Sequence, residues 1–191
     1  MSRWIGPADT AEWLSLFEDF SQSAFRLEGL QTYDATGEEE EAVARFLADG
    51  TYDLDLSWWT SMVKGHTDSG HKMTRVRVIV EPLTDYTRFE LAGYPQMDAA
   101  GDEIRIIEAP EGTWPEGVPQ HDFWLFDDRD VWQMHYDDAY AFVGAELVSD
   151  PDDIAEHLRW RDAAIAQSVP LADYLAKAAH DLHPGGVVKD A

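Results

Sequence analysis

Near the middle of the chain, hydrophobic and polar residues alternate in a way that predicts a buried β-strand. Val76, Val78 and Val80 form one apolar face, whereas the opposite face is mixed and carries Arg75 and Arg77. Alternation with a period of two is typical of a strand, and β-branched residues favour it. A Glu-Pro pair directly afterwards ends the strand, because proline cannot donate to a backbone ladder. We therefore expect a central strand with two arginines on one face.

A second strand and an intervening helix extend this segment into a strand–helix–strand unit. The pattern Glu-Ile-Arg-Ile-Ile at 103–107 predicts the second strand. Residues 83–92 are predicted to be helical, with a break at the Gly-Tyr-Pro of 93–95 and a shorter helical turn that Gly101 ends. Two strands joined by a helix within about 35 residues indicate a parallel pair.

The rest of the chain shows helical and strand periodicities around a proline- and glycine-rich loop at 108–120. Apolar residues at spacings of three and four predict helices, and short alternating runs predict strands. The predicted helices cover 11–23, 38–49, 58–65, 151–168 and 170–178, and the further predicted strands cover 25–27, 122–126, 131–136 and 142–148. We predict an α/β fold, with α+β as the alternative, in which helices flank a central mixed sheet of about five to six strands.

Composition limits the class of protein. The 191 residues are 45% hydrophobic, which is typical of one packed domain; we assign this domain to 1–180 and expect 181–191 to be a flexible tail. No cysteine is present, so disulfides and thiolate zinc sites are excluded. Since the chain shows neither a leader pattern nor an apolar run long enough to span a bilayer, we expect a cytoplasmic protein that does not bind membranes.

The formal charge of −24 bears on the partners of the protein. A negative field repels phosphate backbones, so we expect no direct binding of nucleic acid. Solubility alone is one explanation of the charge; a basic protein partner or mimicry of nucleic acid is the other, and a homodimer is compatible with the sequence. We predict no cofactor and no metal site, because the glutamates of 38–41 point in different directions on a helix and the polar link at 66–71 lacks a recognised ligand spacing.

The predicted helix at 151–168 contains a charged residue where an apolar one is expected. Its apolar residues share one face, and Asp162 falls within that face. A buried carboxylate is costly unless it is paired. Arg75, Arg77 and Arg105, on strands that this helix could cover, are the available partners. We therefore predict a buried polar network that includes Arg105 and Asp162, with a ligand-binding polar pocket as the alternative.

A second group of candidates surrounds His121. Asp127, Asp128 and His135 follow it within two predicted strands. A histidine near carboxylates can serve as general base or nucleophile, which makes this group of residues a candidate catalytic site. The alternative is that the aspartates form a hairpin turn and the histidine ends a loop.

The exit of the central strand is the best prediction for a ligand pocket. Ligands often bind at the carboxyl ends of strands in parallel α/β sheets, and polar residues are dense there. Polar residues that cap a helix would produce the same pattern. The candidate ligand-binding residues are Arg75, Arg77, Glu81, Asp85, Tyr86 and Arg88, and Glu90 lies in the same polar segment.

Four segments carry a resemblance to a known family: RVRVIVEPLTDYTRFEL, HDFWLFDDRDVWQMHYDD, GAELVSDP and HLRWRDAAIAQSVPLADYL. Together they resemble the uncharacterised actinobacterial domain of unknown function 6879, from LFEDFSQSAFRLE to Leu175. The resemblance implies a gene located near helix-turn-helix regulators, and no established activity. A fainter resemblance is to the phospholipase D-like fold, whose catalytic motif His121 and Asp128 match in spacing. Phe123 occupies the position of the lysine of that motif.

We therefore expect a non-catalytic regulatory or protein-interaction protein. The family resemblance implies an acidic partner of a helix-turn-helix transcriptional regulator, and the negative charge favours a basic partner. The alternative is a degenerate phospholipase D-like phosphodiesterase, or a small-ligand sensor, with its site around His121 and the arginines of the central strand.

Overall fold

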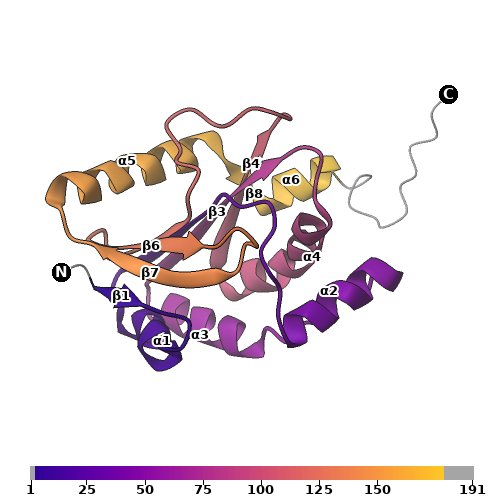
Figure 1. Cartoon of the computed structure of the whole chain (residues 1–191), viewed down its shortest axis with the longest axis horizontal. Helices are drawn as coiled ribbons and strands as arrows, with labels where there is room; N and C mark the ends of the chain where they lie inside the picture. The colour runs from indigo at the N-terminus through magenta and orange to yellow at the C-terminus, as the bar shows by residue number, and fades with distance from the viewer. Residues whose placement is uncertain (1–2, 179–191) are drawn as a thin grey trace.

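The computed structural model describes residues 3–178, and one mixed sheet of eight strands forms its centre (Figure 1). In space the strands follow the order β1-β7-β6-β5-β2-β3-β4-β8. β2, β3 and β4 are parallel, and every other pair of neighbours is antiparallel. The predicted α/β class, mixed sheet and parallel pair are thereby confirmed. The strands are β1 (Trp4–Ile5), β2 (Ser23–Glu28), β3 (Lys72–Val80), β4 (Asp102–Ala109), β5 (Phe123–Phe126), β6 (Asp130–Tyr136), β7 (Phe142–Val148) and β8 (Val169–Pro170).

The sheet has eight strands, whereas the sequence predicts five to six. The additional strands are β1 and β8, which have two residues each and form the two edges. A segment of this length is too short to show a period, so the pattern of residues could not reveal it. Short edge strands also limit the unpaired backbone that a sheet presents to other chains.

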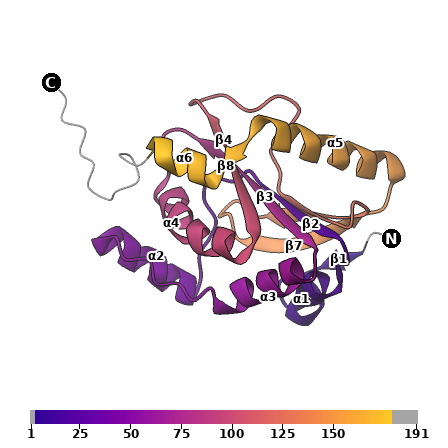
Figure 2. The ribbon, with the colours of Figure 1, turned by 180° about the vertical axis from the view of Figure 1, so that it is seen from behind.

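Helices cover both faces of the sheet (Figures 1 and 2). α5 lies over one face, while α1, α3 and α4 lie over the other. α6 packs beside α4 against β4, and α2 packs on the outside of α4. The helices are α1 (Thr10–Asp19), α2 (Glu38–Asp49), α3 (Ser57–Asp68), α4 (Asp85–Ala100), α5 (Pro151–Gln167) and α6 (Leu171–Ala178).

The alternation of side chains along β3 decides which helices cover its arginines. Val76 and Val78 belong to the apolar cluster beneath α5. Ile79 packs with residues of α4 and α6 on the opposite face. Because successive side chains of a strand point to opposite faces, Arg75 and Arg77 share the face of Ile79 and point away from α5.

The orientation of α5 corrects the prediction for Asp162. The buried residues of this helix are His157 and Ala164, and Trp160 packs against the same cluster. The buried face is therefore centred on His157 and Ala164. The ring of Trp160 adds a large apolar area to the contact with the sheet. Asp162 lies outside this face: 68% of its side chain is exposed, and it pairs with the neighbouring Arg161 at 2.8 Å.

The path of α4 corrects a second prediction. The helix does not break at 93–95 but continues through Pro95 as far as Ala100. Proline removes one helical hydrogen bond, but burial of Leu91 and Tyr94 against the sheet holds the two halves in line. Gly101 ends the helix in the left-handed region with φ at 111°, as predicted.

Candidate functional site

One face of the central strands carries a set of buried charged side chains, which we call the arginine–carboxylate network. Arg26 and Glu28 alternate with apolar residues on β2, so both point to the face of Arg75 and Arg77. α4 contributes a carboxylate from above, and the start of β4 and the residue before β5 each contribute one more. The members are Arg26, Arg75, Arg77, Glu28, Glu90, Asp102 and Asp122.

Asp122 forms the end of the network beside β5 and is fully buried. One carboxylate oxygen accepts from Arg26 at 3.0 Å, from the Tyr33 hydroxyl at 2.6 Å and from the Tyr136 hydroxyl at 3.1 Å. The other accepts from the backbone N–H of Gly29 at 2.7 Å. Four donors therefore satisfy this carboxylate, as a buried charge requires.

Glu28 lies at the centre of the network. Its Oε1 is 2.5 Å from Nη1 of Arg75, and its Oε2 accepts from the Tyr94 hydroxyl at 3.1 Å. Burial by itself raises the pKa of Glu28, but Arg75, Arg26 and Arg77 together outweigh burial and lower the pKa to about 2. Glu28 is thus ionised and paired.

Asp102 marks the edge of the network beside α3. Nη2 of Arg75 lies 3.4 Å from its carboxylate. Burial raises the pKa of Asp102, and the attraction of Arg75 offsets this only in part. The guanidinium of Arg75 also lies 5.6 Å from the centre of the Trp59 ring, within the range of cation–π attraction.

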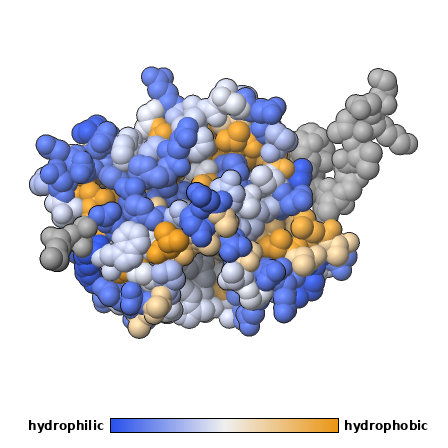
Figure 3. All heavy atoms as spheres, in the orientation of Figure 1, coloured by the Kyte–Doolittle hydropathy of each residue, from blue (hydrophilic) through white to orange (hydrophobic). Residues whose placement is uncertain are grey.

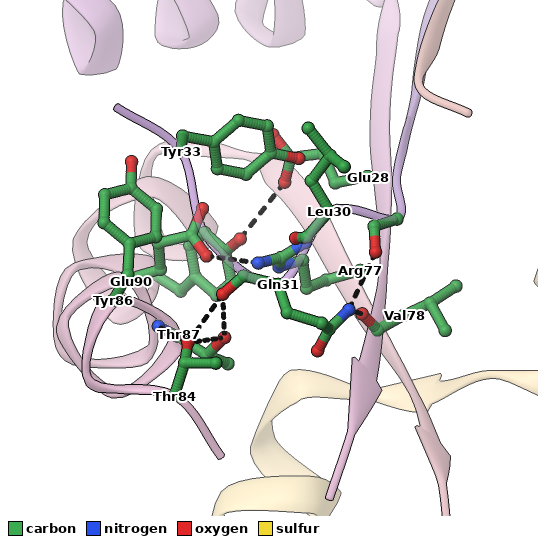
Figure 4. Close-up of polar contacts among 12 residues, drawn as sticks. Glu28, Leu30, Gln31, Tyr33, Arg77, Val78, Thr84, Tyr86, Thr87 and Glu90 are labelled. Carbon is green, nitrogen blue, oxygen red and sulfur yellow. Dashed lines mark hydrogen bonds and ion pairs between the residues drawn. The ribbon is translucent and has the colours of Figure 1, made fainter. Parts of the chain in front are cut away.

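Arg77 joins β3 to α4 and is completely buried (Figure 4). Its Nη2 lies 2.7 Å from Oε2 of Glu90, and its Nη1 donates to the carbonyl of Leu30. Burial raises the pKa of Glu90 to about 7, because Arg77 and, more weakly, Arg75 offset its desolvation only in part and the charge of Glu28 adds to the rise. Glu90 is therefore the member of the network that titrates near neutral pH.

The segment after β2 closes the carboxyl end of the parallel strands (Figure 4). The side-chain amide of Gln31 donates to the carbonyl of Val78 at 2.9 Å, and its oxygen accepts from the N–H of Val80 at 2.8 Å. The backbone carbonyl of Gln31 accepts from the hydroxyls of Thr84 and Thr87 at 2.6 and 3.0 Å. These contacts fix the start of α4 and the loop above β2 to one another.

The network is suited to hold the fold together rather than to react. Its carboxylates are paired inside the protein, and its arginines are covered by helices. Within residues 3–178, Nη1 of Arg26 and Nε of Arg77 are the atoms of the network without a hydrogen-bond partner. In the same residues, no group of three or more histidine, aspartate or glutamate side chains is arranged to hold a metal ion.

The candidate ligand-binding residues do not converge. Arg75 and Arg77 are buried in the network, whereas Glu81 and Asp85 are exposed. Arg88 pairs with Asp85 at 3.0 Å on the surface. The Tyr86 hydroxyl instead donates to Glu39 of α2 at 2.7 Å. The predicted pocket at the strand exit is therefore replaced by helix-capping and surface contacts.

The prediction that Asp162 pairs with an arginine of the sheet is wrong, because Asp162 pairs with Arg161. Nε and Nη2 of Arg105 donate to the hydroxyl and the carbonyl of Ser168, at 2.9 and 3.0 Å. The side chain thus fixes the end of α5 to β4 without a carboxylate from that helix. The partners of Arg75 and Arg77 are Glu28, Asp102 and Glu90.

The candidate catalytic pair is also separated. His121 precedes β5, whereas Asp128 lies in the turn after β5 and pairs with Arg161. A strand advances about 3.3 Å per residue, so a separation of seven positions places the two residues at opposite ends of the strand. Phe123, at the position of the lysine of the phospholipase D motif, is fully buried.

Sequence reasoning did not identify the carboxylates that pair with the arginines of the network. Arg26 and Glu28 share one face of a six-residue strand, and this alternation is a signal that the sequence contains. Glu90 and Asp122 have no comparable signal, because their proximity to the arginines depends on the order of the strands and on the path of α4.

Comparison with known families gives one match. The family described as a domain of unknown function, DUF6879, matches residues 11–176. No curated protein matches the chain. No helix within residues 3–178 has the length and apolar character that crossing a bilayer requires.

Proposed function

We propose that the chain, which belongs to the DUF6879 family of domains of unknown function, is a non-catalytic regulatory protein that binds a basic protein partner through its acidic surface. The observation that carries this proposal is the placement of charge. The arginine–carboxylate network contains three arginines and four carboxylates, a charge of −1, so about −23 of the formal charge of −24 lies on the rest of the chain. Outside the network, acidic residues therefore far outnumber basic ones.

The face of the molecule in Figure 3 is largely hydrophilic, with hydrophobic residues in separate smaller areas. α2 begins with four consecutive glutamates, of which Glu38, Glu40 and Glu41 are exposed. Complementary charge accelerates the encounter of proteins and selects among partners. A helix-turn-helix regulator is a partner of suitable charge, because proteins that bind DNA carry basic surfaces.

A non-catalytic role is supported by the positions and the pairing of the candidate reactive groups. The buried charged residues satisfy one another, and His121 and Asp128 lie at opposite ends of β5. His121 and Asp128 are therefore not the adjacent histidine–carboxylate pair that a shared catalytic role would use. This separation favours a binding role over a catalytic one.

The test is binding to a purified helix-turn-helix regulator encoded by a neighbouring gene. We expect complex formation in calorimetry at about 0.05 M NaCl and an affinity at least about tenfold weaker at about 0.5 M, because salt screens surface charge. Replacing Glu38, Glu40 and Glu41 by glutamine should slow association. Arg88→Gln is the matched control, since it makes the surface more negative and should not weaken binding.

Two results would contradict the proposal. One is no complex with the regulator at the low salt concentration. The other is an affinity that neither salt nor the glutamine substitutions change, since such a complex would not depend on the acidic surface.

A further inference from the structure

Two half-buried histidines, one near the end of α3 and one just before β3, form a hydrogen bond with each other. Nδ1 of His66 lies 3.0 Å from Nδ1 of His71. The buried ring of Phe20, the residue after α1, stacks on His66 with the ring centres 3.9 Å apart. A hydrogen bond between two ring nitrogens contains one proton, so one nitrogen must donate it and the other must accept it.

The second nitrogen of His66 determines which ring donates. Nε2 of His66 lies 2.6 Å from the carbonyl oxygen of Phe17, in the last turn of α1. A carbonyl oxygen only accepts, so Nε2 carries a hydrogen, and in the neutral ring Nδ1 of His66 is an acceptor. The proton between the rings therefore belongs to Nδ1 of His71. Because the last carbonyls of a helix have no intrahelical donor, His66 also caps the end of α1.

The hydrogen bond limits how many protons the two rings can hold. Nε2 of His71 makes no hydrogen bond within residues 3–178, so it can take up one further proton while the bond persists. The negative end of α1 favours the positive charge that results. A second proton would have to bind Nδ1 of His66, where it would face the N–H of His71 across 3.0 Å. Two donors cannot share a hydrogen bond, so a pair with two positive charges has to separate.

No charged side chain takes part in this bond. Within residues 3–178 the ion pair that involves a histidine joins His135 to Glu146, so the two rings of the pair form none. Of the charged residues around the pair, Asp68 pairs with Lys64 at 3.0 Å, and Asp127 accepts backbone N–H groups of 21–23. The charged residues on the elements around the pair are Glu18 and Asp19 of α1, Lys64 and Asp68 of α3, Lys72 of β3, Asp98 of α4 and Asp127 after β5.

We propose that His66 and His71 form a proton-operated latch between α1 and the link at 69–71, which connects α3 to β3. The latch is closed while the pair carries at most one positive charge, and it opens when acid protonates both rings. The link is the side that moves, because it is exposed at Gly70, whereas the buried ring of Phe20 packs on His66. This latch is independent of the acidic surface that binds the partner protein.

The experiment follows both rings of the whole protein by NMR, with spectra that distinguish protonated from unprotonated ring nitrogens. At pH about 8 we expect hydrogen on Nε2 of His66 and on Nδ1 of His71, and at pH about 5 both rings should be charged. The backbone N–H groups of Gly70 and His71 donate to carbonyls at the end of α3. After correction for the intrinsic rate, their protection against hydrogen exchange should fall at least about tenfold between the two pH values, the loss expected for one hydrogen bond.

A matched pair of variants separates the latch from a general effect of acid. His71→Asn places an amide near the position of Nδ1 that can donate or accept but does not titrate, so the link should stay protected at pH about 5. His135→Asn makes the same change on β6, where the ring contacts Trp4 rather than another histidine, and it should lose protection as the wild type does. Circular dichroism establishes that both variants are folded.

Three results would overturn the proposal. The first is hydrogen on Nε2 rather than on Nδ1 of His71 at pH about 8. The second is protection of the link that stays unchanged at pH about 5, whether one ring or both are charged. The third is that folded His71→Asn loses as much protection on acidification as His135→Asn does.

Discussion

Glu90 faces Arg77 at 2.7 Å, yet its pKa is raised to about 7, because burial disfavours its charge more than the attraction of Arg77 and Arg75 favours it. In the folded state Glu90 thus keeps its proton above the ordinary value of 4.5, at which the unfolded chain loses it. The stability linked to this proton is complete below pH 4.5 and is lost as the pH rises through 7. The difference between the two pKa values corresponds to about 3 kcal/mol of unfolding free energy.

We therefore predict that Glu90→Gln removes part of the pH dependence of unfolding. Glutamine keeps the shape and the acceptor for Arg77 but does not titrate. Urea denaturation at a series of pH values should show that the wild type loses about 2–3 kcal/mol relative to the variant between pH 4.5 and 7. Glu103→Gln, at an exposed carboxylate, is the control and should follow the wild type. Parallel curves for the wild type and Glu90→Gln would contradict the raised pKa.

At the same scale, the sequence identifies the arginines of the network but not their carboxylates. Arg75 and Arg77 stand out because charges on a buried strand need partners. The helical periodicity of α5 made Asp162 the candidate partner. In the structure α5 buries a different face, and the side chain of Asp162 is exposed to solvent. The true partners come from β2, α4 and β4, and their proximity depends on tertiary structure rather than on local spacing.

Among the elements, α4 shows how packing overrides local rules. The sequence predicts a break at 93–95, since glycine and proline are poor residues for the interior of a helix. The helix nevertheless continues, and its glycine lies where the ring of Tyr52 approaches the backbone. Strong periodicity predicted the existence of the helices, whereas interruptions and rotations depended on contacts that distant segments provide.

The prediction for this element is that Gly93→Ala destabilises the protein although alanine favours helices. A Cβ at Gly93 would overlap the hydroxyl and ring of Tyr52. Overpacking of this kind typically costs about 1–3 kcal/mol. Gly65→Ala in α3 is the matched control, because nothing lies within 4 Å of its Cβ position, and it should stabilise by about 0.5–1 kcal/mol. Thermal unfolding of both variants measures the difference, and equal shifts of the same sign would contradict the close contact.

For the whole molecule, the fold class followed from local patterns, but the arrangement of the sheet did not. The strand–helix–strand unit predicts the parallel pair β3–β4, which neighbours in the chain form. The pairing of β5 with β2 joins segments about a hundred residues apart, and the edge strands contain two residues each. Hydrophobic period cannot specify a non-local partner, and it cannot detect so short a strand.

The charge of the whole molecule leads to a last prediction, on salt. Acids held at the surface of a chain with formal charge −24 repel one another, and folding brings them closer together. At about 0.1 M salt, ions largely screen the interaction between exposed charges that are more than about 10 Å apart. They screen the buried pairs of the network much less. Raising NaCl from about 0.02 to about 0.5 M should therefore raise the melting temperature by several degrees, since the repulsion weakens while the buried pairs persist.

Calorimetry of the wild type and two variants checks this prediction. The variant with glutamine at Glu38, Glu40 and Glu41 carries less charge and should gain less from salt than the wild type. Arg88→Gln, which increases the negative charge, should gain at least as much as the wild type. A melting temperature that falls with salt would mean that surface ion pairs such as Arg88–Asp85 outweigh the repulsion. Such pairs are worth little individually, so the repulsion of the unpaired acids should decide the sign.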